Sequence, residues 1–122
     1  MGKEEIFNAL KKELSAFSPL LEVTKDLESN YELYGTKSVT VGKKTVDKMY
    51  FASAIIQKNF VGFYFFPIYT HRQEFNDTPQ ELQKCLKGKS CFHIKKNDEQ
   101  LIQQIRDILK KGKEVYQKAG WI

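Results

Sequence analysis

The segment from residue 47 to residue 69 constrains the fold of this chain more than any other. It reads DKMYFASAIIQKNFVGFYFFPIY, with two apolar, aromatic-rich halves on either side of the polar pair Lys58-Asn59. Side chains alternate between the two faces of a strand, so the segment predicts a β-hairpin with a two-residue turn. On one face this register places Ile56 opposite Val61, Ala54 opposite Phe63 and Ala52 opposite Phe65. We expect that face to lie under helices, because alanine lets a helix approach a sheet closely.

The opposite face of the same hairpin is also apolar. It is expected to form a patch made of Phe51, Ser53, Ile55, Phe60, Tyr64 and Phe66. An exposed apolar patch of this kind usually marks an interface or a ligand site. Three alternatives are open, of which the first is favoured. Segments 36–48 and 67–79 fold over the patch, or two copies of the chain pack through it, or it binds a small anionic or aromatic ligand or single-stranded nucleic acid.

Helical periodicity brackets the strands. Apolar residues recur at helical spacing in residues 3–17 and again between a cap at Asn97 and a stop at Gly120. The remaining predicted elements are strands over 20–24, 31–35 and 89–95 and a short helix over 78–86. The predicted fold class is therefore α+β, one domain over residues 1–122. It is a two-layer sandwich, with an antiparallel sheet of about five strands and both long helices on one face, in the order α-β-β-β-β-α-β-α.

Charge is distributed unevenly along the chain. The net charge is +5; residues 1–82 hold 10 basic and 11 acidic side chains, whereas residues 83–122 hold 10 and 4. Such a basic block could attract phosphate, nucleic acid or an acidic partner. We favour lysines that protect an edge strand, because no base-reading motif accompanies them, and nucleic acid is not an expected partner. The basic patch consists of Lys84, Lys87, Lys89, Lys95 and Lys96.

Several features predict a cytosolic protein away from membranes. The first ten residues, MGKEEIFNAL, lack the apolar core of a secretion signal. The longest apolar run, residues 60–69, is half the length of a spanning helix and contains Pro67. Two cysteines are too few for a disulfide scaffold, so reduced thiols are expected.

Cysteine and histidine provide one candidate metal site. Cys91 and His93 lie two residues apart on a predicted strand and therefore share a face. With Cys85, and His71 as a fourth ligand, they could hold zinc or copper. The spacing matches no common zinc motif, and buried structural cysteines are favoured over a metal site. No nucleophile–base pair is evident either, so catalysis is not expected.

Two blocks of the sequence, and the order of its elements, resemble the YdhG-like family of small bacterial domains of unknown function. The resemblance covers about residues 4–118. It implies a frataxin-like fold, and some members carry an iron-chaperone label. The matching residues are Tyr31-Glu32-Leu33, Phe51-Ala52, Asn59 to Tyr64, Pro67, and Lys87 to Phe92.

The chain is therefore predicted to be a small non-enzymatic binding or interaction module without a resident cofactor. Its expected partners are a second copy of itself or a small anionic ligand. One alternative is a frataxin-like iron or metal chaperone, although lysines alternate with the carboxylates of residues 3–13, which does not suit a hard cation. The other alternative is an enzyme whose site lies over the outer face of the sheet.

Overall fold

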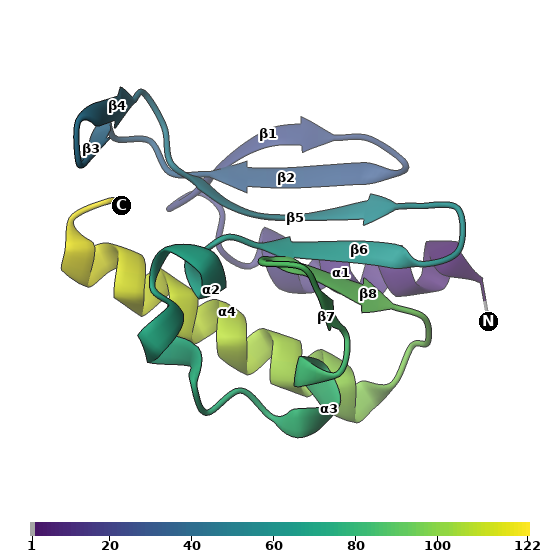
Figure 1. The fold of residues 1–122 in the computed structure, drawn as a ribbon. Helices are drawn as coiled ribbons and strands as arrows, with labels where there is room; N and C mark the ends of the chain where they lie inside the picture. The colour runs from purple at the N-terminus through teal and green to yellow at the C-terminus, as the bar shows by residue number, and fades with distance from the viewer. Residues whose placement is uncertain (1) are drawn as a thin grey trace.

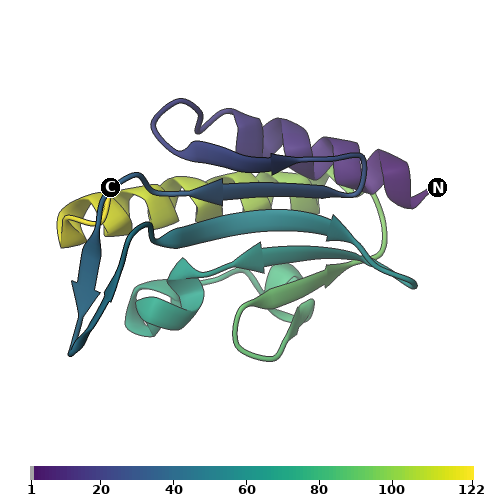
Figure 2. The same ribbon diagram turned by 90° about the horizontal axis from the view of Figure 1, so that it is seen from above.

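The computed structural model describes residues 2–122, and its architecture is α+β, as predicted (Figure 1). A six-stranded antiparallel sheet has the order β1-β2-β5-β6-β8-β7. The long helices α1 and α4 both lie on one face of it, and α4 passes behind the sheet in Figure 2. The helices are α1 (Lys3–Ser15) and α4 (Glu99–Ala119), and the strands are β1 (Glu22–Asp26), β2 (Asn30–Tyr34), β5 (Tyr50–Ile56), β6 (Val61–Phe65), β7 (Leu86–Lys87) and β8 (Cys91–Ile94).

The central hairpin has the predicted register. Its pairs are Ala52 with Phe65, Ser53 with Tyr64, Ala54 with Phe63, Ile55 with Gly62 and Ile56 with Val61. A hydrogen bond from the backbone N–H of Gln57 to the carbonyl of Phe60, 2.8 Å long, closes the two-residue turn. Both alanines and both phenylalanines of the inner face are fully buried. The assignment of this face to the helix-covered core is confirmed.

Phe51 is a correction to the expected outer patch. Leu33 pairs with Ala52 and Tyr34 pairs with Tyr50, so Phe51 is an unpaired extra residue in β5. Such a bulge rotates the strand locally. The ring of Phe51 consequently enters the core, 5.5 Å from that of Tyr116, and Tyr50 occupies the outer face instead.

The sheet has six strands rather than about five, because residues 86–87 form a short strand where the sequence predicted the end of a helix. This strand, β7, lies at one edge of the sheet. A separate two-stranded sheet contains β3 (Val39–Val41) and β4 (Lys44–Val46). Between β6 and β7 the chain forms three short helical segments, which are α2 (Pro67–Thr70), the 3₁₀ helix η1 (Arg72–Phe75) and α3 (Gln80–Gln83).

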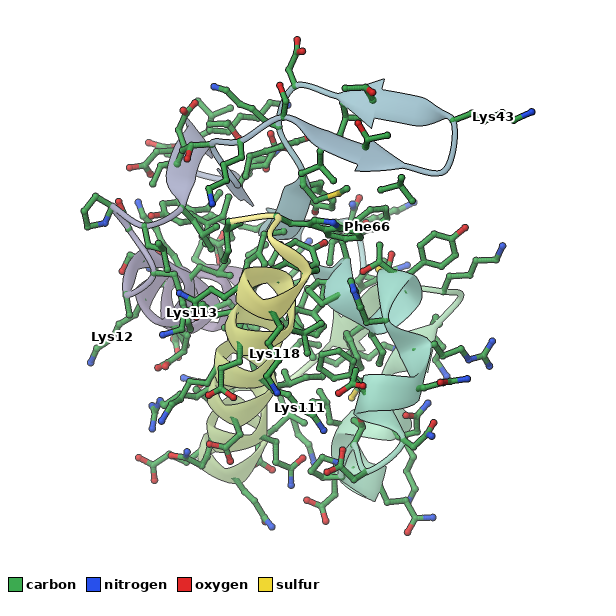
Figure 3. The ribbon with its side chains drawn as sticks, turned by 90° about the vertical axis from the view of Figure 1, so that its left-hand side faces the viewer. Lys12, Lys43, Phe66, Lys111, Lys113 and Lys118 are labelled. Carbon is green, nitrogen blue, oxygen red and sulfur yellow. The ribbon has the colours of Figure 1, made fainter. Side chains whose placement is uncertain are left out.

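Neither segment expected to cover the outer face does so. The β3–β4 hairpin stands at one end of the sheet, with Lys43 at its tip (Figures 2 and 3). Segment 67–79 packs on the helix side, because the ring of Phe75 lies edge-on to Phe65 at 5.3 Å and Lys111 of α4 contacts Asp77 at 2.8 Å. Of that segment only Tyr69 reaches the outer face, where its ring lies 5.5 Å from that of Phe66. The outer face is therefore left without a helical cover among the described residues.

The termini of α4 follow helix-capping rules with one shift. Asp98, not Asn97, is the N-cap, and its carboxylate accepts hydrogen bonds from the backbone N–H groups of Gln100 and Leu101. Gly120 ends the helix with a φ of 79°, a value that favours glycine. No helix within residues 2–122 is long and apolar enough to cross a membrane.

Candidate functional site

A cleft of about 440 Å³ opens beside the β7 edge of the sheet, between the α2–η1 segment and the β7–β8 turn. Its residues come from several short stretches of chain between residues 68 and 89. The lining consists of Ile68, Tyr69, Arg72, Phe75, Asn76, Gln83, Leu86, Gly88 and Lys89. The lining thus combines cations, amides and apolar groups.

The core fixes the walls of the cleft. Ile68 and Phe75 are 6% and 4% exposed, and they anchor the α2–η1 segment against the sheet. The intervening Tyr69 and Arg72 therefore project outward, and Tyr69 is 48% exposed. On the opposite wall, Gly88 has a φ of +88° with open space around it, which permits the turn that presents the next residue, Lys89.

The charge of the cleft is positive and uncompensated. Arg72 and Lys89 line it, and none of its nine lining residues is acidic. Within residues 2–122 neither cation takes part in a salt bridge. The ammonium nitrogen of Lys89 instead lies 5.3 Å from the ring centroid of Tyr69. An exposed cation–π contact of this kind contributes only about 0.5–1 kcal/mol, so Lys89 remains available to an anion.

Two other concavities already contain a carboxylate. Between α1 and α4, Arg106 donates two hydrogen bonds to Glu13, at 2.7 and 3.0 Å. The hydrogen bonds from the Arg106 guanidinium are the main cause that lowers the pKa of Glu13 below its usual value. Beside α3, Lys111 is paired with Asp77. Lys111 and Lys113 lie on different sides of α4, and Lys113 lines the concavity beside α1 together with Lys110 (Figure 3). The α2–η1 cleft differs from both in that its lining holds no carboxylate, so an anion that binds there meets no like charge.

The predicted basic patch is dispersed around the β7 edge, and all five of its lysines are exposed. Only Lys89 lines the cleft. Lys87 lies on the edge strand itself, where a charged side chain disfavours pairing with another chain. Lys84 follows α3, and Lys95 and Lys96 follow β8.

The outer face carries the other predicted patch residues: Ser53, Ile55, Phe60, Tyr64 and Phe66. They are not bare. Ser53 is 1% exposed and shares a hydrogen bond with the hydroxyl of Tyr50. The rings of Tyr34, Tyr50, Phe66 and Tyr69 form a row with successive centroid distances of 5.2, 5.6 and 5.5 Å. The last ring of this row also lines the cleft, so the two features are continuous.

The predicted metal ligands do not come together. Cys91 and His93 pair with Tyr64 and Gly62 and thus share the outer face, as expected. Cys85 packs against the core instead, with its thiol directed at the carbonyl of Glu81. Within residues 2–122 no group of three His, Cys, Asp or Glu side chains is placed to hold a metal ion.

The remaining histidine lies elsewhere. His71 contacts the indole of Trp121 at 4.8 Å, near the end of α4. The ring of His93 stacks on Phe60 at 3.7 Å with an angle of 10° between the planes. Aromatic packing thus accounts for the surroundings of both imidazoles.

The outer face offers no activated nucleophile in the described chain. Burial raises the pKa of Cys91, which keeps the thiol protonated at neutral pH. Burial also raises the pKa of Tyr64, and the neighbouring thiol of Cys91 raises it further. Burial raises the pKa of Tyr50 still more. These groups are suited to hydrogen bonding rather than to nucleophilic attack.

Sequence reasoning found only one residue of the cleft, Lys89. Tyr69, Arg72 and Asn76 were missed because residues 68–77 show neither helical nor strand periodicity, and Gln83 was assigned only to the predicted short helix over 78–86. The sequence feature that could have indicated the site is the apolar pair Pro67-Ile68, followed four residues later by Arg72. Nothing in the local pattern indicated that this arginine faces the Gly88-Lys89 turn.

Comparison of the chain with known protein families, with curated proteins and with solved structures finds no match. The function is therefore proposed from the geometry of the site.

Proposed function

We propose that this protein is a non-enzymatic binding module that takes a small anionic ligand in the α2–η1 cleft. The observation that carries the proposal is the pair of cations, Arg72 and Lys89, in a cleft whose lining contains no carboxylate, imidazole or thiol. Cations without internal partners favour an external anion. The lack of a general base or a nucleophilic thiol in the lining favours binding over catalysis.

The two cations would contribute to anion binding in different ways. The planar guanidinium of Arg72 can donate two parallel hydrogen bonds to a carboxylate or phosphate. The ammonium of Lys89 supplies a mobile point charge from a turn. The amides of Asn76 and Gln83 can each donate and accept, and so orient polar groups of the ligand. The cleft volume of about 440 Å³ lies within the range of ordinary ligand pockets.

Chemical-shift titration tests this proposal directly. We expect the backbone amide of Gly88 and the side-chain amides of Asn76 and Gln83 to shift saturably with inorganic phosphate, ribose 5-phosphate or benzoate. Binding should weaken with rising salt, because the attraction is between exposed charges. If none of the three anions shifted the Gly88 amide saturably at low salt, the proposal would be wrong.

Charge-removing variants localise the effect. Arg72→Gln and Lys89→Gln should each weaken binding, and the double variant should abolish it. Lys87→Gln is the matched control, because it removes a lysine from the same turn region but not from the lining. Equal weakening by Lys87→Gln would mean that general surface charge, rather than the cleft, attracts the anion.

A face-to-face homodimer is the second candidate. It is favoured by the row of aromatic rings on a sheet face that no helix covers, seen in Figure 2 as the face turned to the viewer. Light scattering across a concentration series tests it, with Phe66→Ser as the interface variant. A monomer at every concentration would exclude it.

The remaining alternatives have weaker support. Iron binding by α1 is less favoured because one of its carboxylates, Glu13, is already paired with Arg106. Metal analysis of untagged protein, with Cys91→Ser as control, would test both metal readings. Membership of the YdhG-like family and a cytosolic location are proposed on the sequence features, and the two free cysteines are consistent with a reducing compartment.

A further inference from the structure

Tyr69 differs from the other aromatic residues near the cleft in its exposure. It is 48% exposed, whereas Phe75 on the same wall is 4% exposed. The centroid of its ring lies 5.5 Å from that of Phe66 and 5.3 Å from the ammonium nitrogen of Lys89. A large part of an aromatic surface is thus presented to the cleft, beside the charges that would hold an anion.

The cation on this ring is easily displaced. Lys89 has no carboxylate partner within residues 2–122, and its turn is exposed and bounded by a glycine with positive φ. An ion pair with hydrogen bonds is stronger than an exposed cation–π contact. An arriving anion should therefore draw the ammonium away from Tyr69. The ring surface that Lys89 leaves is then free to stack on a planar group of the same ligand.

The rest of the lining suits such a planar group. Ile68, Phe75 and Leu86 provide an apolar floor that removes a ring from water. Asn76 and Gln83 offer both donors and acceptors at the side, as ring heteroatoms or substituents require. A purely charged ligand such as inorganic phosphate would leave the floor and the exposed phenol ring unused.

We infer that the ligand of this cleft is a planar aromatic or heteroaromatic ring joined to a phosphate or carboxylate group, with Tyr69 as its stacking platform. This inference rests on the proposed function, because the anionic group is held by Arg72 and Lys89. It adds the class of ligand: aromatic acids or nucleoside monophosphates, rather than aliphatic anions.

Matched ligand pairs test it by calorimetry. Benzoate and cyclohexanecarboxylate have the same charge and similar size, and adenosine 5′-monophosphate and ribose 5-phosphate differ by the base. The aromatic member of each pair should bind about tenfold more tightly, as expected for one stacked ring. Tyr69→Leu should remove this preference, and Tyr69→Phe, which keeps an aromatic ring, should keep it. The two pairs also distinguish a carboxylate from a phosphate as the preferred anion.

The outcomes separate the two proposals. Equal affinity within both pairs would overturn the stacking inference while anion binding stands. Absence of binding by all four compounds would overturn both. Undiminished binding of the aromatic members to the Arg72→Gln, Lys89→Gln double variant would place the ring at another site and also overturn the inference. Because Tyr69 is half exposed, both of its variants should retain the thermal midpoint of the wild type.

Discussion

Gly112 in the middle of α4 lies directly against the ring of Phe65 on β6. A Cβ atom on Gly112 would be 2.5 Å from Cζ and 2.8 Å from Cε1 of that ring. The ring cannot move aside freely, because Phe65 is fully buried and packs edge-on against Phe51 and Phe75. The glycine therefore sets how closely the long helix approaches the sheet.

This contact makes Gly112→Ala a destabilising substitution. In an exposed helix interior alanine would gain about 1 kcal/mol over glycine. Here the added methyl group overlaps Phe65, and overpacking a core typically costs about 1–3 kcal/mol. We expect a net decrease in the free energy of unfolding, measured by urea denaturation. Gln117→Ala, on the exposed side of the same helix, should change it by less than about 0.5 kcal/mol. A more stable Gly112→Ala protein would contradict the contact.

The bulge in β5 predicts different costs for two phenylalanines that strict alternation would place on the same face. Phe51 is fully buried against Tyr116, so Phe51→Ala should reduce the free energy of unfolding by about 3–5 kcal/mol. Phe66 is only half-buried on the outer face, and Phe66→Ala should cost clearly less. Similar losses in chemical denaturation would mean that Phe51 does not point into the core.

These two residues also mark how far the sequence determines the fold. The register from Ala52 to Phe65 could be predicted because it follows from strand alternation around one short turn. The inward rotation of Phe51 could not, because the bulge arises from pairing with Leu33 and Tyr34 on another strand. The alternation of side chains within one strand does not show where that strand has an extra residue relative to the strand it pairs with.

The candidate site was less accessible to sequence reasoning than the fold. Its cations, Arg72 and Lys89, lie in a 3₁₀ helix and in a turn, and only the docking of α2 and η1 beside β7 brings them to one cleft. The edge strand itself is two residues long, too short for a periodic pattern. Tertiary packing of irregular segments thus decides the position of the site.

The hydrogen bond between Ser53 and Tyr50 should be measurable as an energetic coupling. Ser53 is 1% exposed, so Ser53→Ala leaves the hydroxyl of Tyr50 without this partner in a largely buried position. A buried hydroxyl without a partner costs roughly 1–3 kcal/mol. Removing both hydroxyl groups in the Ser53→Ala, Tyr50→Phe double variant should recover part of that loss. A double-mutant cycle by urea denaturation gives the coupling, and strictly additive losses would exclude the bond.

Two buried phenols should make the protein lose stability at alkaline pH. Burial raises the pKa of Tyr50 and of Tyr116 above the ordinary value of 10.0. Their contribution is complete below pH 10 and is lost as the pH rises toward the folded pKa, because only the unfolded chain then ionises them. The unfolded state binds fewer protons, so the free energy of unfolding should fall by up to about 1.4 kcal/mol per pH unit for each phenol. Tyr116→Phe should give a shallower slope between pH 10 and pH 12 in denaturation experiments than the wild type. Parallel slopes for Tyr116→Phe and the wild type would show that Tyr116 titrates alike in both states, contrary to its full burial and its hydrogen bond to the backbone carbonyl of Tyr50.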